Sequence, residues 1–364
     1  MIVAIVLCAM TAALRAQMAT ADRVQAPGWW PTKGAAARTD YVGATTCAAC
    51  HRREAATQPA TAMARTMTRA RSSEPLRANR RLAIKGGQYT YEIVTDDRQS
   101  VYTVSDGDRT VSAPLTWAFG VGNVGQSFLF EREGSIHEAR ISYYDGIHAL
   151  DFTPARAGET RTIDEAVARK VGAAEARRCF ACHATASSAD GVFDAEAATP
   201  GVTCEACHGP GRLHVEAIRD RGDRTRPVAI LNPAKLEPAD IVDFCGACHA
   251  TFWDVKLADE KGIAALRSQP YRLLSSKCWS GGDRRLTCIA CHNPHVPLVG
   301  DAAAYDARCL GCHATRGAAR DAAHRAPACK VADGGCVTCH MPKYEVPEMH
   351  HEFTDHLIRV VRSR

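Results

Sequence analysis

From about Leu82 to Phe152 the chain is a series of short segments in which apolar and polar residues alternate. These segments are rich in Val, Ile, Thr, Tyr and Phe, and the sequences KGG, DDRQ, SDGD and EREG separate them. A period of two is typical of strands with one buried face, and Gly- and Asp-rich stretches are typical of turns. The pattern predicts a small antiparallel β-rich insert of about six strands within residues 81–155.

Two segments beside this insert have helical spacing. EAATQPATAMARTMTRAR places Met63 and Met67 one turn apart, after an interruption at a proline. TIDEAVARKVGAAEARR places Ile163 and Val167 on one face of a helix that leads into Cys179. Beyond this point the chain has only short helical segments and a Pro-rich connection, RPVAILNPAKLEPAD, so we expect short helices and irregular loops there.

The cysteines change this picture, because 14 of the 17 belong to one repeated pattern, C-x-x-C-H. It occurs seven times, and we number the motifs 1 to 7 in chain order. Their residues are Cys47, Cys50 and His51; Cys179, Cys182 and His183; Cys204, Cys207 and His208; Cys245, Cys248 and His249; Cys288, Cys291 and His292; Cys309, Cys312 and His313; and Cys336, Cys339 and His340.

C-x-x-C-H is the pattern of c-type haem attachment, in which two thiols bind the macrocycle and the histidine coordinates its iron. Residues i, i+3 and i+4 share one face of a helical turn, so all three side chains reach one porphyrin. A zinc ribbon, a thioredoxin-like pair and a disulfide framework are the alternatives for a single copy. Seven copies, each with a histidine directly after the second cysteine, favour seven c-type haems.

Haem also changes the meaning of the composition. Aromatic residues make up only 6% of the chain, so seven macrocycles would provide much of the apolar core, and we expect the region after Cys179 to be unfolded without them. The formal charge of +5 falls to about −2 when seven ferric haems with their propionates are added, which excludes a basic nucleic-acid-binding protein. The arginine-rich run from Arg69 to Arg81 then predicts a solvated face or a linker.

The first residues resemble a secretory signal peptide. An apolar run from Ile2 to Leu14 precedes small residues, and Ala19-Thr20-Ala21 resembles a cleavage site. The run is short for a membrane span, and Cys8 falls inside the segment to be removed. The predicted organisation is a signal peptide (1–21), a segment with one haem (22–80), the β-rich insert (81–155) and a six-haem cytochrome domain (156–364).

Several stretches resemble the multihaem cytochromes c of the cytochrome c554 type: YVGATTCAACH, ATAMARTM, GVTCEACHGPGRLHVEA, LTCIACHNPH, CKVADGGCVTCHMPK and HHEFTDHLI. The resemblance covers nearly all of the chain after the signal peptide. It implies short α-helices and irregular loops wrapped around packed haems, in a protein exported to the periplasm or the cell exterior. The chain lacks the C-x-x-C-K substrate motif typical of pentahaem nitrite reductases, which weakens that interpretation.

Eight histidines remain for the sixth coordination position of the irons. The resemblance implies His351 and His356, from the H-x-x-x-T-D-H tail, and His214 and His295, which should reach haems other than their own. His350 could replace His351. Ligand chemistry adds the last two candidates, His324 and Met63, since neutral imidazole and thioether both bind haem iron.

His137 and His148 lie in the β-rich insert and are expected to be structural. The resemblance also implies cysteines in the settings of Cys278 and Cys329, and a disulfide between these two is the hypothesis for the remaining thiols. Two buried free thiols are the alternative.

Six distal candidates for seven irons leave two functions open. If every iron has two protein ligands, the protein is an electron carrier, and no catalytic residue is assigned. If one iron is open, the chain is an oxidoreductase acting on a small nitrogen or sulfur oxo-compound such as nitrite, hydroxylamine or tetrathionate. We favour the carrier, with a quinol-oxidising complex or another cytochrome as donor, a reductase or extracellular acceptor, and a possible homo-oligomer or filament.

Overall fold

The computed structural model describes residues 36–220, 230–262, 264–280, 285–313, 329 and 334–359. Those within 36–231, together with 345–351, form the first unit, and those within 232–344, together with 352–359, form the second. The predicted signal peptide, residues 1–21, and the candidate ligand His324 lie outside the described residues.

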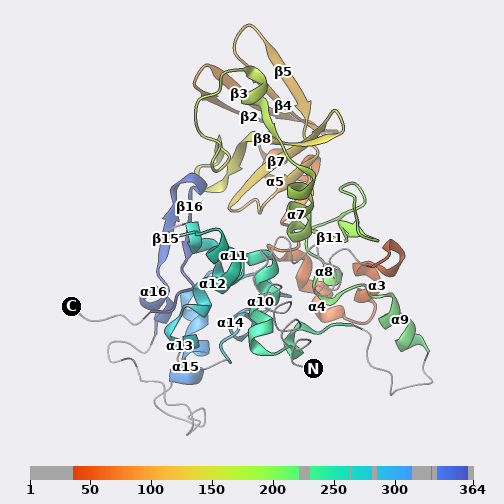
Figure 1. Cartoon of the computed structure of the whole chain (residues 1–364), viewed down its shortest axis with the longest axis vertical. Helices are drawn as coiled ribbons and strands as arrows, with labels where there is room; N and C mark the ends of the chain where they lie inside the picture. Colours follow the sequence, from red (N-terminus) through yellow and green to blue (C-terminus); the bar gives the residue numbers. More distant parts are fainter. Residues whose placement is uncertain are drawn as a thin grey trace, which may run out of the picture. The chain divides into compact units, whose positions relative to one another are not determined.

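The first unit contains a four-stranded antiparallel sheet in chain order (Figure 1). Tight turns explain this meander, since the Asp96 carboxylate accepts the amides of Arg98 and Gln99, and Asp106 accepts those of Asp108 and Arg109. The strands are β2 (Arg81–Gly86), β3 (Tyr89–Thr95), β4 (Ser100–Ser105) and β5 (Thr110–Pro114).

A second antiparallel sheet has the order β1-β6-β7-β8-β10, with β9 also paired to β8. A bulge between Ser127 and Leu129 shifts the β7–β8 register. The strands are β1 (Met67–Arg69), β6 (Trp117–Phe119), β7 (Gly125–Arg132), β8 (Ser135–Tyr144), β9 (Ala149–Phe152) and β10 (Ala168–Lys170).

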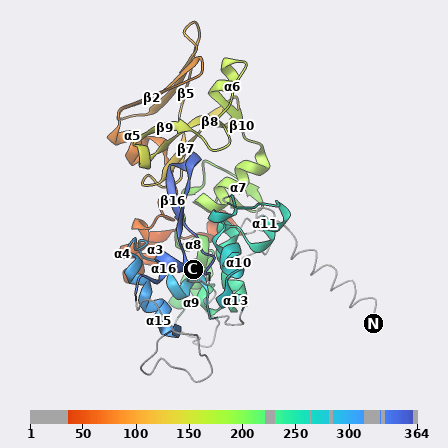
Figure 2. The same ribbon diagram turned by 90° about the vertical axis from the view of Figure 1, so that its left-hand side faces the viewer.

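The two sheets share one hydrophobic core with helix α6 (Ile163–Val167), which packs on β4, β5 and β8 (Figure 2). Tyr91 and Tyr102 from the smaller sheet are buried there with Phe128 and Phe130 from the larger one. The buried Tyr102 hydroxyl donates to the Val167 carbonyl at 2.9 Å, so its polar end is satisfied. The antiparallel β-rich character predicted for this region is therefore confirmed.

Long-range pairing overrides several local predictions. Eight strands rather than about six fall between Arg81 and Phe152, because the run 110–119 divides into β5 and β6 and the short strand β9 pairs with β8. The helix predicted over Met63 and Met67 is wrong: Met67 begins β1, which pairs with β6. The helix predicted from Ile163 into Cys179 is interrupted by β10, which pairs with β8.

The run from Arg69 to Arg81 is not a linker. It contains η3 (Ala70–Ser72) and α5 (Glu74–Ala78), and the side chains of Ala70 and Leu76 are completely buried in the core shared by the sheets. Arg69 forms a bidentate ion pair with Glu196. The apolar residues between the arginines therefore anchor this run.

Short helices make up most of the rest of the first unit. They carry motifs 1 to 3 and the segments around them. They are η1 (Arg38–Asp40), α3 (Ala44–Ala48), α4 (Arg52–Thr57), η2 (Gln58–Ala60), η4 (Asp145–Ile147), α7 (Ala173–His183), α8 (Cys204–His208) and α9 (Arg212–Arg219), with two-residue strands β11 (Ala184–Thr185), β12 (Ser188–Ala189), β13 (Val192–Phe193) and β14 (Thr199–Pro200).

The second unit is built from short helices that carry motifs 4 to 7 (Figure 1). None of its described helices, nor any in the first unit, is long and apolar enough to cross a bilayer. Its helices are η5 (Pro233–Lys235), α10 (Pro238–His249), α11 (Phe252–Leu257), η6 (Ala264–Arg267), α12 (Gln269–Leu274), α13 (Lys277–Ser280), α14 (Cys288–Cys291), η7 (Ala302–Tyr305), α15 (Asp306–His313) and α16 (Cys336–His340).

A hairpin of β15 (Lys343–Val346) and β16 (His351–Thr354), with η8 (Pro347–Met349) at its turn, precedes the C-terminal segment. Large apolar side chains beside the later motifs are exposed in the described second unit, among them Ile289, Leu298 and Leu310. Its buried apolar residues are concentrated in and between α10 and α12, at Ile241, Val242, Ala247, Val255, Ala265, Leu266 and Leu273.

This contrast predicts how the chain responds to loss of haem. In protein made without haem attachment, we expect the two sheets to keep their amide protection, since their core consists of side chains, while the described residues 285–313 and 334–344 exchange freely. Hydrogen exchange with peptide-level resolution measures both regions in one sample. Equal protection of the two regions would contradict the prediction.

Candidate haem sites

All seven motifs lie among the described residues, and the first cysteine of each lies in a helix. In motif 1 the His51 amide donates to the Cys47 carbonyl at 2.9 Å, and in motif 5 the His292 amide donates to the Cys288 carbonyl at 3.0 Å. These i to i+4 bonds place the first cysteine and the histidine of a motif on the same face. The local geometry therefore suits three side chains that converge on one macrocycle.

Three proximal histidines are oriented through Nδ1 by oxygens from remote parts of the chain. His183 Nδ1 lies 3.1 Å from the Thr66 carbonyl and 2.7 Å from its hydroxyl. The corresponding contacts of His208 with the Leu231 carbonyl and of His340 with the Arg359 carbonyl are 2.8 and 2.7 Å. A carbonyl only accepts, so Nδ1 carries the proton and Nε2 keeps its lone pair for a metal.

Two proximal histidines face a second imidazole. The ring centres of His51 and His214 are 6.3 Å apart with planes inclined by 31°, and those of His292 and His356 are 6.1 Å apart, inclined by 40°. Two metal–nitrogen bonds of about 2 Å, with about 1 Å from each nitrogen to its ring centre, place two axial imidazoles about 6 Å apart. Each pair is therefore spaced to hold one iron between its rings.

The electrostatic environment keeps these rings neutral. Burial lowers the pKa of His356 to about 4, and burial followed by the charge of His51 lowers the pKa of His214. Burial and the neighbouring His249 likewise lower the pKa of His292. Because only a neutral imidazole has a lone pair for iron, all three are in the ligating form at neutral pH.

The second nitrogens of these rings also suit ligation. His356 Nδ1 lies 3.1 Å from the Thr354 carbonyl, which leaves Nε2 for a metal. The buried Nδ1 of His214 has no hydrogen-bond partner in the described chain. A buried polar atom without a partner is costly unless a ligand satisfies it, so the donor set fits haem iron.

The first cysteines of six motifs meet in pairs. In the pairs Cys47 and Cys204, Cys245 and Cys288, and Cys309 and Cys336, one thiol shifts the pKa of the other, and the helices that hold them are in contact: α3 with α8, α10 with α14, and α15 with α16. The neighbouring Cys47 thiol lowers the pKa of Cys204 to about 7. Haem attachment converts these thiols into thioethers, but the adjacency of their backbones remains. Motifs 1 and 3, 4 and 5, and 6 and 7 are therefore neighbours.

Glu205, between the two cysteines of motif 3, ties this motif to the segment before motif 1. Its carboxylate is buried and accepts the backbone amides of Val42, Gly43 and Gly211 at 2.9, 2.8 and 2.8 Å. A Cβ atom on Gly211 would lie 2.8 Å from the Val42 side chain, so the approach requires glycine. Sequence reasoning missed Glu205, although an acidic residue inside a haem motif was a visible signal.

Met63 lies in the turn 61–66, which contacts the residues around two motifs. Its carbonyl accepts the Val202 amide at 3.0 Å, and Thr66 holds His183. A Cβ atom on Gly201 would lie 1.9 Å from the Ala64 carbonyl oxygen. The half-buried Met63 is thus brought near motifs 2 and 3, and its ligand role stays a prediction.

His350 is engaged elsewhere in the first unit. Its Nε2 lies 2.7 Å from the Asp151 carboxylate, and its ring packs edge-on against Tyr144 at 5.1 Å. These contacts disfavour the replacement of His351 by His350 as a ligand. His351 on β16 and His295 in the turn after α14 are half-buried, and both remain predicted ligands.

The other singled-out residues have simpler surroundings. The ring of His137 stacks on Phe130 with ring centres 5.6 Å apart, and the side chain of His148 is 79% exposed beside Asp145; their structural roles stay predictions. Cys278 is half-buried in α13 and Cys329 is exposed, and the disulfide between them stays a prediction.

Comparison with known proteins places part of the chain near one family. A family model described as cytochrome c554 and c-prime matches residues 135–209, which include motifs 2 and 3. This match supports a multihaem c-type cytochrome. In the match, α7 and α8 carry the haem motifs and β8 and β10 precede them.

One solved structure, the outer cell wall cytochrome OcwA, resembles this chain with 12% sequence identity and a TM-score of 0.48, over 88% of this chain and 80% of that one. At this TM-score the likeness does not establish a shared fold. No curated protein matches the chain.

The Glu205 contacts predict a large effect of one substitution. In Glu205→Gln an amide group replaces one oxygen and faces a backbone donor, so we expect a loss of about 1–3 kcal/mol in unfolding free energy. Denaturant titration followed by haem absorption measures it. Glu216→Gln on α9 is the matched control, because its i,i+4 ion pair with Arg212 is exposed and solvent screens it. Equal losses in both variants would exclude the proposed role of Glu205.

Proposed function

We propose that this chain is an exported heptahaem c-type cytochrome that relays electrons through closely packed haems. The observation that carries the proposal is the contact between helices that hold the first cysteines of different motifs, α3 with α8, α10 with α14 and α15 with α16, because macrocycles tethered there must be neighbours. Bound haem supplies a reversible ferric–ferrous couple. The chain's own contribution is to hold the rings, fix their axial ligands and exclude water.

The tethers are the fourteen motif cysteines, and the proximal ligands are the seven motif histidines. His51 with His214, and His292 with His356, are proposed as complete axial pairs, supported by ring-centre distances of 6.3 and 6.1 Å. Two imidazole ligands favour a low-spin iron suited to electron transfer. His295, His351, His324 and Met63 remain the candidates for the other irons.

We propose that the donor is a membrane quinol-oxidising complex or another cytochrome, and the acceptor a reductase or an extracellular compound. The signal-like residues 1–21 support a periplasmic or extracellular location. N-terminal sequencing of protein purified from its native source tests this, since a chain that begins at Met1 would contradict export through this segment.

The test of the function combines haem counting with spectroscopy. Intact mass should correspond to seven haems, and electron paramagnetic resonance of the ferric protein should show low-spin irons only. Nitrite, hydroxylamine and, after reduction, carbon monoxide should leave the spectra unchanged. A high-spin iron that binds one of them would instead favour the oxidoreductase, and fewer than seven haems would contradict the proposal.

The two axial pairs make a separate prediction. His214→Ala and His356→Ala should each convert one low-spin iron to high-spin, because water or no ligand replaces an imidazole. Paramagnetic resonance at low temperature counts the converted irons. His148→Ala and His350→Ala are controls of equal chemistry and should change none. An unaltered spectrum in either test variant would remove that histidine from the ligand set.

A further inference from the structure

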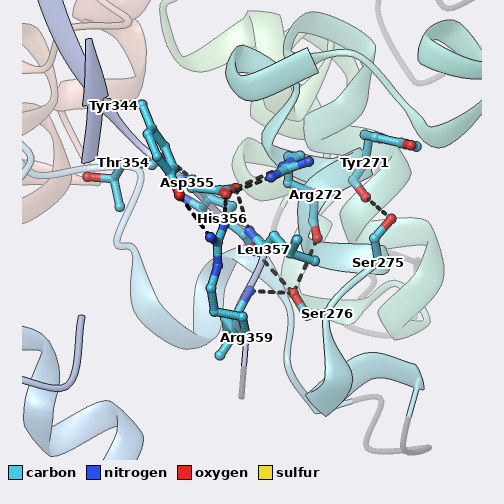
Figure 3. A network of polar contacts seen from close by, with 11 residues as sticks. Tyr271, Arg272, Ser275, Ser276, Tyr344, Thr354, Asp355, His356, Leu357 and Arg359 are labelled. Atoms are coloured by element: carbon cyan, nitrogen blue, oxygen red, sulfur yellow. Dashed lines mark hydrogen bonds and ion pairs between the residues drawn. The ribbon is translucent and has the colours of Figure 1, made fainter. Parts of the chain in front are cut away.

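The C-terminal segment 355–359 is held around a buried carboxylate in the second unit (Figure 3). The side chain of Asp355 is 0% exposed. Arg272 on α12 donates to its two oxygens at 2.8 and 2.6 Å, Arg359 donates a further bond, and the Leu357 amide donates at 2.9 Å. A buried carboxylate with this many charged and backbone donors fixes the chain around it.

A second set of contacts fastens the same segment to the residues after α12. The Ser276 hydroxyl accepts the Ile358 amide at 2.9 Å and lies 3.1 Å from the His356 carbonyl (Figure 3). The Tyr344 hydroxyl accepts a bond of 2.8 Å from Arg359. Both ends of the segment are therefore anchored, with His356 between them.

Two iron sites meet in this segment. The His356 ring faces His292 of motif 5 at 6.1 Å, and the Arg359 carbonyl accepts from His340 Nδ1 of motif 7 at 2.7 Å. The Arg359 amide also donates to the His340 carbonyl at 3.2 Å. Five residues thus provide a facing imidazole at one site and the orienting acceptor at another.

We propose that Asp355 is a positioning residue for motifs 5 and 7 together. Its carboxylate holds the segment so that His356 can act as second axial ligand at motif 5 and the Arg359 carbonyl can keep the proton on His340 Nδ1 at motif 7. The proposal rests on the proposed haem ligation. Asp355 itself touches neither iron and acts through these two residues.

A positioning role and a purely electrostatic role of Asp355 predict haem potential shifts of different sign in the Asp355 and Arg272 variants. Removing a negative charge raises nearby potentials and removing a positive charge lowers them, so Asp355→Asn and Arg272→Met would then shift potentials in opposite directions. Loss of positioning has the same result in both variants. His356 leaves its iron, and the proximal imidazole of motif 7 loses an acceptor and becomes a weaker electron donor, which raises the potential.

The experiment uses the full holoprotein with Asp355→Asn and Arg272→Met, each also combined with His356→Ala. We expect a high-spin iron in both single variants, and in the His356→Ala background an upward shift of one further potential in both. Spin states come from paramagnetic resonance and potentials from spectroelectrochemical titration. Glu352→Gln, an exposed carboxylate on β16, is the control and should change neither.

The outcomes separate the two proposals. If His356→Ala alone changes no spin state, the axial assignment at motif 5 fails, whatever the Asp355 variants do. If His356→Ala yields a high-spin iron but the Asp355 and Arg272 variants stay low-spin, or shift the potentials with opposite signs, the positioning role is excluded. Should Asp355→Asn fail to incorporate seven haems, Arg272→Met alone decides by the same criteria.

Discussion

Three of the haem sites, those of motifs 2, 3 and 7, depend on hydrogen bonds between the proximal imidazole and a backbone carbonyl. A helical turn can present two thiols and a histidine, but it does not fix which way the imidazole is turned. That orientation comes from Thr66, Leu231 and Arg359, which lie 117, 23 and 19 residues from the histidines that they hold. Each of these three sites is therefore completed only when a second segment of the chain has reached it, although the tether is entirely local.

This constraint explains why single segments serve two sites. Helix α9 follows motif 3 but presents His214 to motif 1, and the tail presents His356 to motif 5 while its backbone orients His340 of motif 7. The buried carboxylates of Glu205 and Asp355 are placed where such segments cross. Fixing one crossing orders two sites, so the conformational entropy lost at that crossing serves both of them, in a chain with only 6% aromatic residues.

The sequence predicted features that depend on neighbouring residues, and the predictions failed where residues distant in the chain determine the conformation or the hydrogen-bond partner. The motifs and the alternating strands were predictable, since thiol spacing and a period of two act within a few residues. The helix expected at Met67 yields to pairing with Phe119 in β6, and the one expected after Ile163 yields to β10 beside β8. The same holds for the adjacent histidines His350 and His351. Asp151, 199 residues away in the chain, binds His350, and nothing in the local sequence indicates this contact. The sequence does not distinguish Glu205 and Asp355 from exposed acidic residues, because most of their hydrogen-bond donors lie far away in the chain.

Within the second unit, the order of the motifs along the chain is also their order in space. Helix α10 with motif 4 contacts α14 with motif 5, and α15 with motif 6 contacts α16 with motif 7. The ring of His292 in motif 5 lies 5.7 Å from the ring of Tyr305, directly before α15, so motif 5 lies beside motif 6. A relay requires contiguous redox centres rather than regular secondary structure. Short helices joined by irregular loops meet that requirement, provided that each imidazole ring is held in place. Backbone carbonyls and buried carboxylates hold the rings where the unit has few buried apolar side chains.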